Sequence, residues 1–135
     1  MKVDGGCHCG AIAYEAEADP DKAGICHCTD CQQLSGAPYR VTLPVRAENF
    51  HLTRGTPRIY IKTADSGRKR AQAFCGDCGA PIYACAPQNP PTISLRWGSI
   101  HQRDQLPPKR MIWCDSAVPF AMNLSGLPGV PRDAD

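Results

Sequence analysis

The chain has 135 residues, of which 42% are hydrophobic, which is enough for one compact domain but too little for two ordinary ones. Its formal net charge of +2 and the lack of a long basic arm do not indicate a nucleic-acid-binding protein, so we expect no nucleic-acid partner. The N-terminal sequence MKVDGGCHCG lacks the apolar segment of a signal peptide, and no apolar run approaches the roughly 20 residues that span a bilayer. We therefore expect a soluble, cytoplasmic protein with no membrane partner.

Most of the chain shows the alternating hydrophobic pattern of short β-strands, as in the alternation of Ile12 and Tyr14. Pro44 is expected to end its strand or to place that strand at a sheet edge. The turn residues 65–67 predict a hairpin that delivers Phe74 to the last cysteine cluster. The predicted strands are 11–17, 39–45, 49–53, 58–63, 69–74, 81–86, 92–97 and 110–114.

Helical character is confined to one or two turns over residues 29–34, which Thr29 or Asp30 could cap. No segment has ten residues of clean helical period. The sequence therefore predicts a mainly β fold of short, mostly antiparallel strands in a single domain over residues 1–125. The remaining residues, 126–135, are rich in glycine, proline and charge and are predicted to form a surface tail.

The nine cysteines are the most informative residues of the chain. An odd number without a secretion signal, in a compartment that keeps thiols reduced, favours metal ligation over a disulfide framework. We interpret the isolated Cys85 and Cys114 as small buried core residues. The other seven fall into three tight clusters: Cys7 and Cys9; Cys26, Cys28 and Cys31; Cys75 and Cys78.

The stretch FCGDCGAP has the form of a zinc knuckle, in which two thiolates are separated by two residues. Gly76 and Gly79 permit the turn that directs backbone amides at the sulfurs. One knuckle supplies two ligands, and a second pair could come from the N-terminal cluster, whose side chains share a face if that segment is extended. This partition groups Cys7, Cys9, Cys75 and Cys78. Spacing also allows a second partition. In it, one closed site is formed by Cys7, Cys9, Cys26 and Cys28. The cysteines left over are then Cys31, Cys75 and Cys78.

On the first partition, Cys26, Cys28 and Cys31 remain together as three thiolates for one ion. Three protein ligands and one open position are typical of catalytic rather than structural zinc. Water or a substrate thiol could fill that position, and a coordinated thiol is deprotonated and reactive. The alternative is a fourth protein ligand from His8, His27, Asp30, Cys85 or Cys114. An extended segment would point His27 away from the sulfurs, and we interpret it as a surface histidine.

Three cysteine motifs, in order, resemble the glutathione-dependent formaldehyde-activating enzyme family, which includes the centromere protein V proteins. The motifs are GxCHCGAIAYE (Gly5 to Glu15), ICHCTDCQQLSGAP (Ile25 to Pro38) and FCGDCGAPIY (Phe74 to Tyr83). The resemblance continues weakly through IWCDSAVPF (Ile112 to Phe120) and so covers most of the chain. Phe120 and Met111 depart from the tryptophan and histidine that are common in relatives, and both substitutions could alter a pocket wall.

The resemblance implies a β-tent fold with two zinc sites. By position, Cys7, Cys9, Cys75 and Cys78 match the structural zinc ligands, and Cys26, Cys28 and Cys31 match the three-cysteine site regarded as catalytic. The implied activity is of the carbon-sulfur lyase type, the reversible joining of glutathione and formaldehyde as S-(hydroxymethyl)glutathione. The expected partner is therefore a small thiol such as glutathione.

In this hypothesis cationic side chains would bind the carboxylates of a glutathione-like molecule, although each is interpreted first as a surface charge. The candidates are Arg40, Arg54, Arg68, Lys69, Arg70 and Arg96. Asp30, Asp77 and Asp115 are candidate proton carriers by chemistry alone. Two other classes compete with the lyase: a non-catalytic zinc-binding interaction module, and a thiol redox enzyme related to methionine-R-sulfoxide reductases, which would use Cys85 or Cys114 as its nucleophile.

Overall fold

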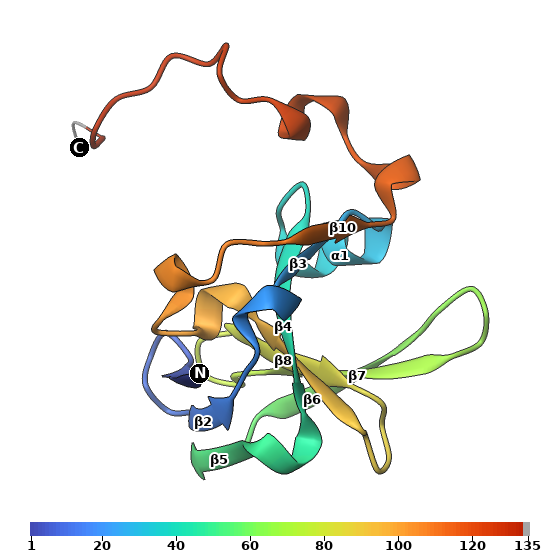
Figure 1. The fold of residues 1–135 in the computed structure, drawn as a ribbon. Coiled ribbons are helices and arrows are strands. Elements are labelled where there is room, and N and C mark those ends of the chain that lie inside the picture. The colour runs from blue at the N-terminus through green and yellow to red at the C-terminus, as the bar shows by residue number, and fades with distance from the viewer. Residues whose placement is uncertain (134–135) are drawn as a thin grey trace.

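The computed structural model describes residues 1–133, which fold into two β-sheets (Figure 1). The smaller sheet has the order β1-β2-β5, and the larger has the order β10-β3-β4-β9-β8-β7-β6. The strands are β1 (Lys2–Gly6), β2 (Ala13–Glu17), β3 (Gly24–Cys26), β4 (Arg40–Arg46), β5 (Phe50–Arg54), β6 (Arg58–Thr63), β7 (Lys69–Phe74), β8 (Pro81–Cys85), β9 (Thr92–Arg96) and β10 (Arg110–Ile112). The mainly β prediction is confirmed.

One α-helix, α1 (Thr29–Ser35), is found in the described part of the chain, and it connects β3 to β4. Its N-cap is Cys28, so the prediction of Thr29 or Asp30 was wrong. The Cys28 sulfur takes the role of the usual capping oxygen by accepting a hydrogen bond from the Cys31 amide at 3.3 Å. Gly36 ends the helix with a φ of 65°, a left-handed conformation that glycine adopts without strain. Six short 3-10 turns complete the helical content of residues 1–133, and none of these helices is long and apolar enough to cross a membrane.

Strand β4 is an interior strand of the larger sheet, despite Pro44. It pairs with β3 only through residues 40–42 and with β9 through residues 42–46. Pro44 lies opposite Ser94 of β9, beyond the end of the β3 pairing. The expectation that proline ends the strand or places it at a sheet edge was therefore wrong. At that point β4 has a partner on one side only, which is where a residue without an amide proton is tolerated.

Two strands were missed by sequence reasoning, and both are short or rich in glycine. β1 ends in Gly5 and Gly6, and β3 has only three residues. β3 is the strand to which β10 adds in parallel, with Ile112 opposite Cys26. β10 ends two residues earlier than predicted because Trp113 has a φ of 57°, which turns the chain out of the sheet. The predicted hairpin of β6 and β7 is confirmed, with Arg58 opposite Phe74.

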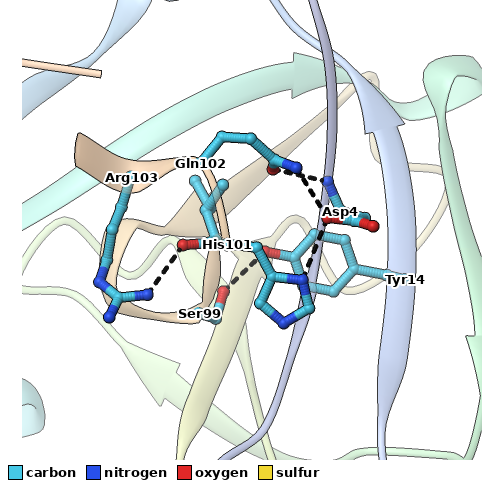
Figure 2. A network of polar contacts seen from close by, with 7 residues as sticks. Asp4, Tyr14, Ser99, His101, Gln102 and Arg103 are labelled. Carbon is cyan, nitrogen blue, oxygen red and sulfur yellow. Dashed lines mark hydrogen bonds and ion pairs between the residues drawn. The ribbon is translucent and has the colours of Figure 1, made fainter. Parts of the chain in front are cut away.

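The two sheets meet where β1 passes the loop after β9. Gly5 forms an isolated bridge with Ile100, and a Cβ atom at Gly5 would lie 2.0 Å from the Ser99 carbonyl oxygen. Only glycine allows this approach. The Tyr14 hydroxyl lies 2.7 Å from Ser99 Oγ (Figure 2). Because Ser99 Oγ donates to the Arg96 carbonyl at 2.8 Å, Tyr14 is the donor in this pair.

A second set of contacts ties the same loop to β1 (Figure 2). The Asp4 amide donates to Gln102 Oε1 at 3.0 Å, and Gln102 Nε2 donates to Asp4 Oδ1 at 2.9 Å. His101 Nδ1 lies 3.1 Å from the same carboxylate oxygen. These contacts with Gln102 and His101 lower the pKa of Asp4. The edge of the small sheet is therefore fixed to the large sheet through side chains as well as backbone.

The described part of the segment beyond β10 stands apart from both sheets (Figure 1), and residues 122–133 are all exposed. The described part of 126–135 lies within this exposed segment, and its assignment as a surface tail stays a prediction. Residues 134 and 135 of the predicted tail lie outside the described residues. The domain boundary at residue 125 stays a prediction.

We predict that Tyr14→Phe lowers the free energy of unfolding by about 1 to 2 kcal/mol, because it removes a buried hydrogen bond and keeps the ring packed on Phe50. Chemical denaturation monitored by fluorescence measures the change. Tyr60→Phe is the matched control, since Tyr60 is 55% exposed, and it should leave stability unchanged. Equal stability of Tyr14→Phe and wild type would contradict the assigned hydrogen bond.

Candidate metal centres

Four cysteine sulfurs from two distant segments form one cluster. Cys7 and Cys9 follow β1, and Cys75 and Cys78 lie in the turn between β7 and β8. All four sulfurs lie within 4.8 Å of one another, and Cys9 Sγ is 3.7 Å from the sulfurs of both Cys7 and Cys75. A tetrahedral ion with metal–sulfur bonds of about 2.3 Å separates its sulfurs by about 3.8 Å. The spacing fits one such ion.

Backbone amides point at these sulfurs, as the knuckle sequence predicts. Ile12 donates to Cys7 Sγ at 3.2 Å, and Asp77 and Cys78 each donate to Cys75 Sγ at 3.4 Å. Amides of Ala80 and Cys9 lower the pKa of Cys78 to about 6. The amides of this turn therefore favour the thiolate form of Cys78, the form that binds metal.

The second cluster contains Cys26, Cys28 and Cys31, whose sulfurs also lie within 4.8 Å of one another. Cys26 ends β3, Cys28 caps α1, and Cys31 lies in the first turn of that helix, so a strand end and a helix start supply all three ligands. Burial opposes ionisation of Cys28, but the Cys31 amide, the neighbouring thiols and Lys62 together lower the pKa of Cys28. Cys7 and Cys9 instead lie beside Cys75 and Cys78. The structure therefore does not form the alternative site, in which Cys7 and Cys9 would join Cys26 and Cys28.

No fourth cysteine, histidine, aspartate or glutamate within residues 1–133 joins the three sulfurs inside the same 4.8 Å limit. Asp30 is instead paired with Lys62, whose Nζ lies 2.7 Å from Asp30 Oδ2. Cys85 is buried in β8, as predicted, and His8 lies outside the cluster, in the lining of a pocket that none of the three cysteines lines. Among the described residues, the cluster is therefore a set of three ligands.

His27 and Cys114 differ from their predicted environments. His27 is only 1% exposed, so its interpretation as a surface histidine was wrong. Its amide donates to the Ile112 carbonyl of β10 at 3.1 Å, and its ring packs edge-on against Tyr39. Cys114 is exposed rather than in the core, because the chain leaves the sheet at Trp113.

Arg40 and Arg96 are the functional candidates that sequence reasoning placed wrongly on the surface. They are 6% and 9% exposed, respectively. Arg54, Arg68 and Lys69 are exposed as expected, and Arg70 is half-buried. Arg96 is the last residue of β9 and directly follows Leu95, and both residues are buried. Two consecutive buried residues break the alternation of a strand, so no periodic pattern could have indicated the burial of Arg96.

Both arginines line two adjoining pockets of about 580 and 400 Å3. The larger pocket also contains Cys7, Ser35 of α1 and Trp97, and the smaller contains Leu34 of α1 and Phe74. Met111 and Phe120, where the sequence departs from its relatives, line neither pocket. The candidate proton carriers Asp77 and Asp115 are exposed and also lie outside both linings.

The fold and these clusters define a mainly β protein with two thiol sites suited to metal ions. The chain belongs to the glutathione-dependent formaldehyde-activating enzyme family, whose sequence model matches residues 2–116. Its fold is similar to that in a crystal structure of a Rhodobacter sphaeroides protein, with a TM-score of 0.61 and 22% identity. The match covers 82% of this chain and 99% of that one, and at this identity it concerns the fold alone.

We predict two metal ions per chain in wild type and one in each of Cys75→Ser and Cys28→Ser. Cys75→Ser should also lower the melting temperature strongly. A four-sulfur site binds zinc with an apparent free energy of about 10 to 16 kcal/mol. This is comparable with the free energy of unfolding of a whole domain, about 5 to 15 kcal/mol. Elemental analysis and calorimetry measure both quantities. Cys114→Ser is the control, because Cys114 lies outside both clusters, and it should match wild type in metal content and melting temperature. Two ions in Cys28→Ser would contradict the three-sulfur site.

Proposed function

We propose that the protein is a zinc-dependent enzyme of the carbon-sulfur lyase type that acts on the adduct of a small thiol and an aldehyde, with glutathione and formaldehyde as the pair. The observation that carries this proposal is the cluster of Cys26, Cys28 and Cys31, which has three sulfurs and no fourth protein ligand among the described residues. Membership of a family named for an enzyme supports it.

In this proposal the two clusters have different roles. Cys7, Cys9, Cys75 and Cys78 hold a structural zinc, because four protein sulfurs leave no position for a ligand. Cys26, Cys28 and Cys31 hold the catalytic zinc. When bound there, zinc supplies a positive charge that stabilises a substrate sulfur as thiolate. The thiols must stay reduced to bind metal, which fits a reducing compartment such as the cytoplasm.

The reaction balances without a further reactant. In the forward direction the substrate sulfur forms a bond to the aldehyde carbon, and the electron pair of the C=O π bond moves to oxygen. The oxygen takes up the proton that the thiol lost, which gives a hydroxymethyl thioether. The reverse reaction breaks the carbon–sulfur bond and returns the proton to sulfur.

The chain's own residues supply position and shielding in this scheme. The Cys31 amide holds the Cys28 sulfur, and the Lys62–Asp30 ion pair ties α1 to β6. Leu34 and Phe74 line the smaller pocket beside the arginines, so a substrate group that enters this pocket would be partly removed from water. Such fixed placement of two reactants is itself a source of rate acceleration.

We predict that glutathione binds to zinc-loaded wild type and that Cys28→Ala abolishes this binding, because the ion at the three-sulfur site is lost. Isothermal titration calorimetry measures the binding. The same variant should lose any acceleration of exchange between formaldehyde and its glutathione adduct, which NMR exchange spectroscopy reports.

Cys114→Ala is the matched control and should bind glutathione as wild type does, since Cys114 is exposed and outside both clusters. Equal heats in wild type and Cys28→Ala would show that this site does not bind the thiol. Two bound ions with neither glutathione binding nor acceleration would instead indicate the non-catalytic zinc module.

A further inference from the structure

Two buried arginine side chains share one neutral partner. Arg40 Nη1 donates to Gln72 Oε1 at 3.3 Å, and Arg96 Nη2 donates to the same oxygen at 2.8 Å. Arg96 lies opposite Thr42 of β4, two residues from Arg40, so the arginines are diagonal neighbours on one face of the sheet. Gln72 comes from β7 of the same sheet.

The carboxylates that the structure describes do not balance this pair. Within residues 1–133 neither guanidinium forms an ion pair with an aspartate or glutamate. Burial, and then the repulsion of Arg40, lower the pKa of Arg96 to about 9. Two adjacent buried cations on one amide oxygen are unfavourable, since buried charges in proteins are normally paired. The arrangement leaves a place for an anion.

The unused nitrogens of the pair are accessible from the pockets. Among the described residues, only the ring nitrogens of His27 are both fully enclosed and without a hydrogen-bond partner. The remaining guanidinium nitrogens of Arg40 and Arg96 therefore reach the space of the two pockets that both residues line. A guanidinium binds a carboxylate with two parallel hydrogen bonds, which neither side chain makes with Gln72.

The pair also lies beside the three-sulfur cluster. Arg40 is directly opposite Cys26 in the pairing of β3 and β4. A thiol at the cluster would therefore extend from it toward the arginines or toward bulk solvent. The smaller pocket beside the arginines has a wall with Leu34 and Phe74, as is typical of a small-molecule site with few polar groups.

We propose that Arg40 and Arg96, held by Gln72, form a subsite for one carboxylate of the substrate, so that this enzyme selects thiols that carry a carboxylate. The inference rests on the proposed function for the thiol end of the substrate, but the anion site itself does not. The competing role is that the arginines only balance the negative charge of the metal–sulfur cluster.

The first test uses acetate against chloride at equal ionic strength, with zinc-loaded protein. Acetate should raise the melting temperature of wild type because it binds the folded state alone. Gln72→Glu places a carboxylate of nearly the same shape between the arginines. This variant should melt at a higher temperature than wild type in chloride and gain nothing from acetate.

The second test compares glutathione with 2-mercaptoethanol, which has a thiol and no carboxylate. Arg96→Gln and Gln72→Glu should each weaken glutathione binding by roughly 10- to 100-fold, the range for a hydrogen-bonded charge, and leave 2-mercaptoethanol binding unchanged. Arg46→Gln is the matched control, since Arg46 is an exposed arginine at the other end of β4, and it should behave as wild type.

The outcomes separate the alternatives. If Arg96→Gln weakens the binding of both thiols equally, the arginine acts on the metal site and the subsite is overturned. An acetate effect of equal size in wild type and Gln72→Glu would also overturn the subsite. No acetate effect in wild type would also overturn it. If acetate stabilises wild type and Gln72→Glu removes the effect, but neither thiol binds, the anion site stands and the proposed function fails.

Discussion

The contact on which the rest of the molecule depends is the cluster of four sulfurs from Cys7, Cys9, Cys75 and Cys78. Cys7 and Cys9 follow a strand of the small sheet, and Cys75 and Cys78 turn between two strands of the large one. One tetrahedral ion would therefore join the two sheets at a single point. The close approach of Gly5 to Ser99 and the buried Tyr14 hydroxyl reinforce the same junction.

The second cluster couples ligation to local structure in a different way. The Cys28 sulfur is at once a candidate metal ligand and the group that caps α1. Because Cys26 and Arg40 lie opposite each other on β3 and β4, the same pairing that positions a sulfur also positions a buried cation. Binding chemistry and stability oppose each other here. A buried cation without a carboxylate partner among the described residues favours an anionic ligand, and it weakens the fold when no ligand is bound.

Several site residues could be predicted from the sequence because their chemistry depends on local spacing. The knuckle of Cys75 and Cys78 and the start of a helix near Cys28 need only a few consecutive residues, and the structure contains both. The position of Pro44 inside an interior strand could not be predicted, because it depends on where β3 stops. The backbone hydrogen bond of His27 likewise depends on β10, more than 80 residues away in sequence.

The sequence by itself determined the mainly β character, the strands with clear alternation, the division of seven cysteines into tight clusters and the family to which the chain belongs. These properties follow from short-range patterns, which a strand or a turn expresses wherever it is placed. Only the tertiary structure decided which clusters combine, that three sulfurs stay without a fourth protein ligand in the described chain, and that Arg40 and Arg96 meet on Gln72. Those facts arise from long-range strand pairing, because register and sheet order decide which distant side chains share a face.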